Sequence, residues 1–578
     1  MYVLGINAYH GDAAAAIISD GQLIAAVEEE RFNRFKHSAG FPEQAIRYCL
    51  KEAGVGLNDL DHIGISRDPS AHLHKKILYA ATRVASLKRT QIKDRLGNAA
   101  RVRDLKDELA RVFNIPKKQL RARFHNIEHH RAHLASCFFV SSFERAALLS
   151  IDGFGDFIST MWAVGHGNSI EVLGQVEYPH STGIVYTATT QFLGFPHYGD
   201  EGKIMGLAPY GQPRFIDHFR EIIRTEETGQ FRLNLDYFRH HSEGVEMTWD
   251  HGSPVIGRVY SDEFARLFGS ARAQGAPLTD RERDIAASLQ LRLEEVAFHI
   301  LNHLHERTGL TDLGLAGGVA YNSVMNGKIL LNTPFDRVYV QPAAGDSGTA
   351  LGVCYQIHNG VLKCERGEVM EGAYTGPQFS NEEVRAALVK SDLAFERYTD
   401  DEITKRAAQD IAAGLVVGWF QGRMEFGPRA LGNRSIVADP RRAEMKDILN
   451  DRIKKREPFR PFAPSVLEER VGDYFEQTHP APTMLMVYQI KKERRNEIPA
   501  VTHVDGSGRL QTVSRAVNER YYQLISDFAE LTGVPVILNT SFNENEPIVC
   551  SPEEAIECFR KTKMDVLYLG NFAVRRGD

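Results

Sequence analysis

The chain has 578 residues, of which 43% are hydrophobic and 25% charged, and its formal net charge is −6. That length exceeds what one hydrophobic core serves, so we expect two or more domains. The mildly acidic balance argues against a nucleic-acid partner, and no apolar run approaches the roughly 18 residues that a membrane span needs. Six cysteines without a CxxC pair, and a start, "MYVLGINAYHGD", that lacks the features of a signal peptide, predict a reducing, cytoplasmic location.

A strand–turn–strand pattern occurs twice in the first half of the chain. Residues 2–7 are predicted to form a buried strand, and residues 13–30 a hairpin around Asp20–Gly21. Residues 144–174 repeat this scheme, with Gly153 and Gly155 in the first turn. The two regions therefore share one strand–turn–strand construction.

A third glycine turn follows in residues 313–330, "LGLAGGVAYNSVMNGKIL", where a strand breaks at Gly317–Gly318 into a helix. Exposed backbone amides and a helix N-terminus favour phosphate groups. The turns resemble the phosphate and adenosine loops of the actin/Hsp70/sugar-kinase superfamily, although most such turns are only hairpins. On this reading Gly153, Gly155, Gly317, Gly318 and Asn322 contact a nucleotide or adenylate.

A basic run separates the two repeats. From His74 to Arg123 there are fifteen Lys and Arg residues against four Asp and Glu. Such a run is usually a solvated helical face. It could also flank the mouth of a site for a charged substrate, and the sequence does not decide between the two.

The stretch "HNIEHHRAHLAS", residues 125–136, contains four histidines. His129 and His133 lie four residues apart, so a helix places them on one face, where two imidazoles can bind one metal ion. His130 points away from this face, and the alternative reading is a polar helix surface. The metalloprotease pattern requires a glutamate directly after the first histidine, whereas Glu128 precedes it.

Two aspartates in glycine-bounded turns could complete such a site. Asp152 ends the strand "ALLSID", and Asp346 lies in "QPAAGDSGTALG". Two imidazoles and two carboxylates suit iron(II), manganese or zinc. The alternative for each aspartate is a turn residue that bonds its own backbone.

The composition shifts near residue 370, where glycine and proline interrupt the periodicity. Strands and helices alternate again after this point. We therefore expect two α/β domains, residues 1–370 and 371–578.

The second domain contains cations in stiff, Gly- and Pro-rich loops. Guanidinium forks bind phosphate through two parallel hydrogen bonds, so these loops are predicted to clamp a polyphosphate or carboxyl-phosphate. The alternative is surface arginines paired with acids elsewhere. The cations are Arg423, Arg429, Arg434, Lys454, Arg456, Arg460 and Arg509, and a buried strand adds Asn539, Thr540 and Ser541 at its end.

Longer blocks carry a more specific signal. Together, and in order along almost the whole chain, they resemble the O-carbamoyltransferases of secondary metabolism, which include the nodulation-factor, cephalosporin-type and aminoglycoside enzymes. The blocks are "HGDAAAAI", "EEERFNRFKH", "EHHRAHLAS", "DGFGD", "EGKIMGLAPYG", "GGVAYN", "PAAGDSGTALG", "EFGPRALGNRSI", "REPFRPFAP" and "LNTSFNENEPIV".

The resemblance implies an actin-like N-terminal domain similar to the threonylcarbamoyl-adenosine transferase. It implies a C-terminal domain similar to the enzyme that makes threonylcarbamoyl-adenylate. In the family, ATP and carbamoyl phosphate form carbamoyl-adenylate in the C-terminal domain. The carbamoyl group then passes, in the N-terminal domain, to a hydroxyl of a small-molecule acceptor, and AMP leaves.

The resemblance also implies roles for single residues. His10 matches the proposed general base, and the metal ligands, with Fe²⁺ first among the candidate ions, match His129, His133, Asp152 and Asp346. The carbamoyl-phosphate and ATP contacts, with Mg²⁺ accompanying ATP, match Arg429, Lys454, Arg460, Arg509 and Ser541, and Asn539 lies beside them. The alternative function is an actin-like small-molecule kinase, which would release ADP instead of AMP and pyrophosphate. The acceptor and the oligomeric state are not predicted.

Overall fold

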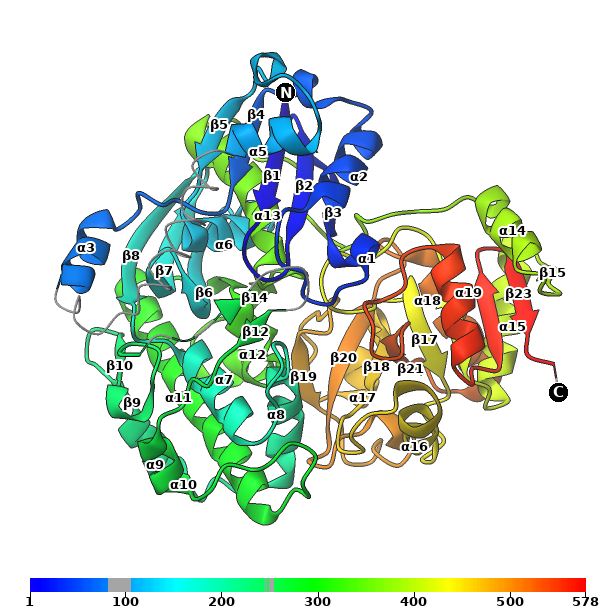
Figure 1. Cartoon of the computed structure of the whole chain (residues 1–578). Coiled ribbons are helices and arrows are strands. Elements are labelled where there is room, and N and C mark those ends of the chain that lie inside the picture. Colours follow the sequence, from blue (N-terminus) through cyan, green and yellow to red (C-terminus); the bar gives the residue numbers. More distant parts are fainter. Residues whose placement is uncertain (82–104, 244, 246, 249–253, 578) are drawn as a thin grey trace. The chain divides into compact units, whose positions relative to one another are not determined.

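The computed structural model describes residues 1–81, 105–243, 245, 247–248 and 254–577 (Figure 1). The chain divides into an N-terminal unit, Met1–Met325 with Ile329–Met370, and a C-terminal unit, Asn326–Lys328 with Glu371–Asp578. Residues 82–104 of the predicted basic run lie outside the described part. No helix within the described residues is both long and apolar enough to cross a membrane.

The N-terminal unit contains two five-stranded sheets. The first has the order β3-β2-β1-β4-β5, in which β1 to β3 are antiparallel hairpins and β4 and β5 run parallel to β1. Its strands are β1 (Tyr2–Asn7), β2 (Ala14–Ser19), β3 (Gln22–Glu28), β4 (His62–Ile65) and β5 (Arg123–Asn126).

The second sheet has the same topology, with the order β8-β7-β6-β13-β14. This duplication is the arrangement of the actin-like fold, and it confirms the fold predicted from the repeated strand–turn–strand pattern. The strands are β6 (Arg145–Gly155), β7 (Ile158–His166), β8 (Ser169–Glu177), β13 (Asp312–Ala316) and β14 (Arg337–Val340).

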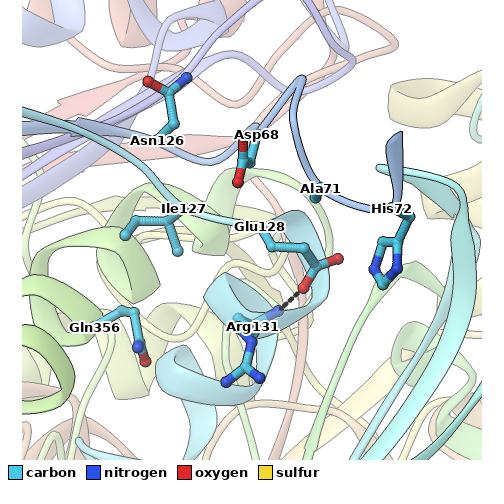
Figure 2. Close-up of a pocket in the computed structure, with 8 residues that line it drawn as sticks. All are labelled: Asp68, Ala71, His72, Asn126, Ile127, Glu128, Arg131 and Gln356. Atoms are coloured by element: carbon cyan, nitrogen blue, oxygen red, sulfur yellow. Dashed lines mark hydrogen bonds between the residues drawn. The ribbon is translucent and has the colours of Figure 1, made fainter. Parts of the chain in front are cut away.

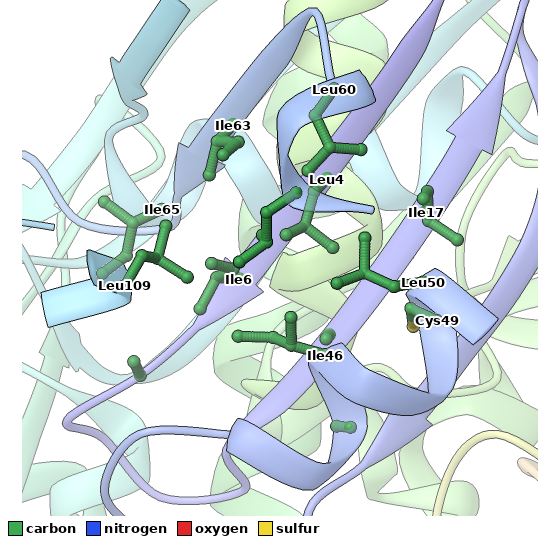
Figure 3. Packing of buried hydrophobic residues seen from close by; sticks show 14 of the residues in the cluster. Leu4, Ile6, Ile17, Ile46, Cys49, Leu50, Leu60, Ile63, Ile65 and Leu109 are labelled. Carbon is green, nitrogen blue, oxygen red and sulfur yellow. The ribbon is translucent and has the colours of Figure 1, made fainter. Parts of the chain in front are cut away.

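The first sheet buries one face against α2 (Glu43–Ala53) and α5 (Leu105–Val112) (Figure 3). Alternate residues of β1, Leu4 and Ile6, point into this core, as the two-residue period of a strand requires. Each such fully buried side chain contributes about 1.5–3 kcal/mol relative to an exposed one. The core therefore fixes β1, whose end carries the loop that contains His10.

Helix α13 (Ser347–Tyr355) packs on the same sheet. A Cβ atom at Gly5 in β1 would lie 2.0 Å from the Ala350 carbonyl oxygen and 2.8 Å from the Cys354 sulfur. Only glycine permits this approach, so the glycine sets where α13, and Asp346 at its start, can lie.

The C-terminal unit is built on one mixed sheet of nine strands, in the order β15-β23-β22-β16-β17-β21-β18-β20-β19. Helices α15 (Asp400–Ala412) and α18 (Glu519–Thr532) pack together in this unit. The α/β class predicted for this region is confirmed, and its specific similarity to a threonylcarbamoyl-adenylate-forming enzyme stays a prediction. The strands are β15 (Glu396–Arg397), β16 (Val417–Phe420), β17 (Arg434–Ala438), β18 (Ala463–Leu467), β19 (Met486–Gln489), β20 (Ser507–Val513), β21 (Val536–Ser541), β22 (Val566–Leu569) and β23 (Phe572–Arg575).

Candidate functional site

Two histidines and two aspartates converge in the N-terminal unit. His129 and His133 lie on one face of α6 (His129–Phe138), Asp152 lies in β6, and Asp346 is the N-cap residue of α13. Both Nε2 atoms lie 3.2 Å from Asp152 Oδ2, and they lie 3.5 and 3.7 Å from Asp346 Oδ1. One ligand atom from each residue lies within 4.8 Å of all the others.

This donor set fits a divalent metal ion. Atoms bound to one ion at about 2.1 Å lie roughly 3.0–3.4 Å apart, and the two Nε2 atoms are 3.1 Å apart. Burial disfavours a charge on His129, yet hydrogen bonds with Asp152 and Asp346 raise its pKa well above the ordinary value. The two carboxylates thus make the site electrostatically negative, which favours a bound cation.

Glycines hold the ligands in place. Asp152 Oδ1 accepts hydrogen bonds from the Gly153 and Gly318 amides, at 2.7 and 3.1 Å, which directs Oδ2 toward the histidines. A Cβ atom at Gly155 would lie 1.9 Å from the His129 ring. These glycines were predicted to contact a nucleotide. In the structure they position Asp152 and His129. Their nucleotide contact stays a prediction.

Asp346 connects the ligand set to His10. Its Oδ2 atom is in hydrogen-bond contact with His10 Nδ1, while Oδ1 faces the two histidines of α6. The loop between β1 and β2 holds His10 in place, because the Asn7 side chain donates to the Gly11 and Asp12 carbonyls at 3.1 and 3.0 Å. Asn7 was not predicted from the sequence, since an asparagine at a strand end is an ordinary turn residue.

Asn322 lies farther along the turn after β13 and has structural partners. Its Oδ1 accepts a hydrogen bond from the Met325 amide and caps α12 (Ser323–Asn332). Its side-chain amide also pairs with Gln290, at 2.8 and 3.0 Å. Because both ends of the amide are engaged, a nucleotide contact by Asn322 stays a prediction without local support.

A second acidic and histidine cluster lies beside the His10 loop. His37 Nδ1 lies 2.8 Å from Asp12 Oδ1, and the His37 amide donates to Glu30 at 2.6 Å. Burial opposes a charge on His37, and Asp12 and then Glu30 raise its pKa. In the sequence these residues appeared only within two longer blocks, "HGDAAAAI", which contains Asp12, and "EEERFNRFKH", which contains Glu30 and His37.

A polar cavity of about 320 Å³ adjoins the start of α6 (Figure 2). Asp156 connects the cavity wall to the start of α6. Its Oδ2 atom accepts hydrogen bonds from the Asp68 amide at 2.7 Å and from the His129 amide at 3.2 Å. The cavity opens at the carboxyl ends of β4 and β5, the edge of a sheet where α/β proteins bind ligands. It is lined by Asp68, Ala71, His72, Asn126, Ile127, Glu128, Arg131 and Gln356.

The C-terminal unit contains a cluster of cations around the end of β21. Lys454 is 2% exposed, and its Nζ donates to the Ser541 carbonyl at 2.6 Å and to the Asn543 carbonyl at 2.7 Å. Burial, and then Arg456 and Arg460, lower its pKa well below the ordinary value. The predicted residues Lys454 and Ser541 therefore lie together, with arginines around them.

Four arginines lie close enough to perturb one another. Burial, followed by Arg429, Arg456 and Arg460, lowers the pKa of Arg509 well below its ordinary value. Within the described residues the Arg509 guanidinium has no hydrogen bond and no ion pair. Crowded cations of this kind form a site for an anion with several oxygens.

Three other predicted residues of this region have structural partners. Arg434 is fully buried, donates to the Gln421 and Pro377 carbonyls and stacks on Phe420. Arg423 donates to the Thr375 carbonyl at 2.6 Å. Asn539, which is 1% exposed, donates to the Ala430 carbonyl next to Arg429. Arg423 and Arg434 thus hold the loop that presents Arg429, which corrects their assignment to the clamp itself.

The chain matches known sequences over most of its length. Residues 2–355 match the family described as Carbamoyltransferase N-terminus, and residues 408–576 match Carbamoyltransferase C-terminus. The nodulation protein NolNO of Sinorhizobium fredii is 40% identical over 99% of this chain and 80% of its own length. An uncharacterized protein of Synechocystis, sll1178, is 42% identical over 100% of this chain and 97% of its own.

Among solved structures, HypF of T. kodakarensis is 11% identical, with 63% of this chain and 48% of that chain covered and a TM-score of 0.32. The two family matches define a transferase, and the sheet topology gives it an actin-like N-terminal unit and an α/β C-terminal unit. The chain belongs to the carbamoyltransferase family.

Proposed function

We propose that this carbamoyltransferase is an ATP-dependent O-carbamoyltransferase. Its C-terminal unit hydrolyses carbamoyl phosphate to carbamate and phosphate. The carbamate oxygen then attacks the α-phosphate of ATP, which forms carbamoyl-adenylate and releases pyrophosphate. Its N-terminal unit transfers the carbamoyl group to a hydroxyl of a small-molecule acceptor. The observation that carries this proposal is the contact between His10 and Asp346, which places a potential proton acceptor against a metal-type ligand set.

The cation cluster of the C-terminal unit supports the adenylation step. Arg429, Arg460 and Arg509 would bind the phosphates of ATP, which Mg²⁺ accompanies, and of carbamoyl phosphate. Lys454 holds the Ser541 and Asn543 oxygens, and so fixes the end of β21 beside these phosphates. Adenylation of the carbamate creates a good leaving group, because charge-assisted hydrogen bonds stabilise the departing phosphate.

The N-terminal ligand set supports metal-assisted transfer. His129, His133, Asp152 and Asp346 would hold a divalent ion, with iron(II), manganese or zinc suited to two imidazoles and two carboxylates. When bound, the ion would supply positive charge that offsets the charge on the adenylate phosphate. Asp152 is held ready for this role by the Gly153 and Gly318 amides.

His10 would remove the proton of the acceptor hydroxyl. If Nδ1 donates its hydrogen to Asp346, Nε2 carries the lone pair that accepts a proton, as in other carboxylate–histidine pairs. The acceptor oxygen then forms a bond to the carbamoyl carbon, the bond from that carbon to the phosphate oxygen breaks, and AMP leaves.

The nucleotide product tests this proposal. Purified protein incubated with ATP, carbamoyl phosphate and glycerol as the hydroxyl acceptor should release pyrophosphate and AMP, and both products should depend on carbamoyl phosphate. Release of ADP with phosphorylation of an acceptor would instead show a kinase of the same fold. Omitting carbamoyl phosphate is the matched control.

A further inference from the structure

Tyr198 lies next to the proposed transfer site and has no role in the steps above. It belongs to the turn between α7 (Thr182–Phe192) and α8 (Glu201–Leu207), directly before the "EGKIMGLAPYG" block. A Cβ atom at Gly11 would lie 2.8 Å from the Tyr198 hydroxyl oxygen. The hydroxyl therefore lies against the residue that follows His10.

The surrounding contacts orient the ring. The Tyr198 ring meets the His37 ring edge-on, with centroids 5.2 Å apart and planes at 75°. His37 is fixed in turn by Asp12 Oδ1 and by its own amide bond to Glu30. Gly199, with φ of +86°, lets His37 pack against the turn, because a Cβ atom there would lie 2.4 Å from His37 Nε2.

The Tyr198 hydroxyl is available as a hydrogen-bond donor. Within the described residues, no hydrogen bond of the Tyr198 hydroxyl is found. Burial, and then the Asp12, Asp346 and Asp152 carboxylates, raise the pKa of Tyr198 well above its ordinary value, so the phenol keeps its proton. The hydroxyl is therefore a neutral donor, and it lies against Gly11, the residue that follows the proposed base His10.

Charge balance shows where such a donor is needed. In the proposed transfer, attack of the acceptor oxygen places negative charge on the carbamoyl carbonyl oxygen. The phosphate charge and the acceptor proton are already accounted for by the ligand set and by His10. We propose that Tyr198 is a catalytic residue that donates its hydroxyl hydrogen bond to the carbamoyl carbonyl oxygen as this oxygen becomes negative. This inference rests on the proposed function.

The substitution Tyr198→Phe tests the proposal, because it keeps the ring contact with His37 and removes only the hydroxyl. Glycerol serves as the hydroxyl probe, and AMP release and glycerol carbamate are measured with ATP and carbamoyl phosphate over a range of glycerol concentrations. We expect transfer to fall by about 10²–10³-fold, as for loss of one oxyanion donor, and by the same factor at every glycerol concentration. Pyrophosphate release and metal content should stay at the wild-type level.

Tyr237→Phe is the matched control, because its hydroxyl bonds Glu221 on the surface of the same unit, and it should not change transfer. Equal transfer rates for Tyr198→Phe and wild type would overturn the inference and leave the proposed function standing. A loss that disappears at high glycerol would also overturn it, since it would show a contact made to the acceptor before reaction. If the wild-type protein releases no AMP, the proposed function fails first.

Discussion

Asp346 contacts His10 through one carboxylate oxygen and faces His133 through the other, 3.7 Å from Nε2. One side chain thus links the proposed base to the proposed ligand set. A carboxylate shared in this way fixes both the tautomer and the ring orientation of the histidine that it contacts. The proton acceptor and the ion site are consequently parts of one hydrogen-bonded unit.

Removal of a histidine ligand should separate the two half-reactions. We expect His129→Ala and His133→Ala to lose bound metal and to lower carbamoyl transfer by more than about 100-fold, because each leaves a single imidazole in the set. Pyrophosphate release should persist, since the cation cluster lies in the other unit. Metal is measured by elemental analysis after anaerobic loading with Fe²⁺, Mn²⁺ or Zn²⁺.

His125→Ala is the control for these variants, because His125 pairs with His62 and not with the ligand set. It should retain metal and transfer. Wild-type protein that binds none of the three ions would refute the site.

Gly155→Ala should damage the metal site without removing a ligand. Its methyl group would overlap the His129 ring, so we expect metal affinity to fall by about 10–100-fold, as for other supports of a metal ligand. Gly153→Ala is a close control, since a Cβ atom there meets nothing within 4 Å. Titration of both variants with the same ion measures the difference, and equal affinities would contradict the packing argument.

Loss of the arginines should impair adenylation. We expect Arg429→Ala, Arg460→Ala and Arg509→Ala each to slow pyrophosphate release by roughly ten- to over a hundredfold, because a charged hydrogen bond to phosphate contributes about 1.5–3 kcal/mol. Arg452→Ala, at an exposed position of the same segment, should be neutral. Near-normal rates in all three variants would rule out the clamp.

Lys454→Ala needs a folding check beside its rate measurement. It should also slow pyrophosphate release, but the same change leaves the Ser541 and Asn543 carbonyls without their donor. A circular dichroism spectrum and melting curve matching wild type would show that the rate effect is local.

His10→Asn should slow transfer alone. A general base contributes about 10²–10⁴-fold, and the amide cannot accept a proton at neutral pH. Metal content and pyrophosphate release should match wild type, because His10 is not one of the four ligands. Transfer at the parental rate would assign proton removal to another residue or to water.

Acid should destabilise the N-terminal unit through His240. Burial lowers the pKa of this 6% exposed histidine to about 4, whereas an unfolded histidine titrates near 6.5. The unfolded state therefore binds more protons between these values, so the contribution of His240 is complete above pH 6.5 and is lost as pH falls toward 4. The loss between pH 7 and pH 5 amounts to about 2 kcal/mol. Urea midpoints at the two pH values should differ less in His240→Asn than in wild type.

Much of this architecture follows from local patterns in the sequence. The two strand–turn–strand repeats indicated an actin-like fold, which the two five-stranded sheets confirm. The four-residue spacing predicted that His129 and His133 share a helix face, as α6 shows. Convergence of Asp152 and Asp346 on that face depends on long-range packing, which no spacing encodes. Gly155 and Gly318 show most clearly what the sequence could not predict. A glycine turn has the same sequence whether it contacts a phosphate or a neighbouring side chain.

Long-range packing also decides which arginines of the C-terminal unit belong to the cation cluster. Arg429 and Arg434 lie five residues apart in one loop, yet Arg434 is fully buried on backbone carbonyls while Arg429 lies among other guanidiniums. Composition marks both as candidates for anion binding. Burial alone separates them, and it becomes visible only when β16 and β17 pair. Tyr198 and Asn7 carried no signal because each is a common residue in an ordinary turn.

The close packing of Gly5 against Ala350 limits how this protein can be redesigned. β1 leads to the loop of His10, and Asp346 is the N-cap residue of α13. The distance between these two side chains therefore depends on the close contact between the main chains of β1 and α13. A methyl group at Gly5 would force the helix off the strand and pull the pair apart, although the residue touches neither of them. Efforts to admit new acceptors should therefore leave the interior of β1 unchanged.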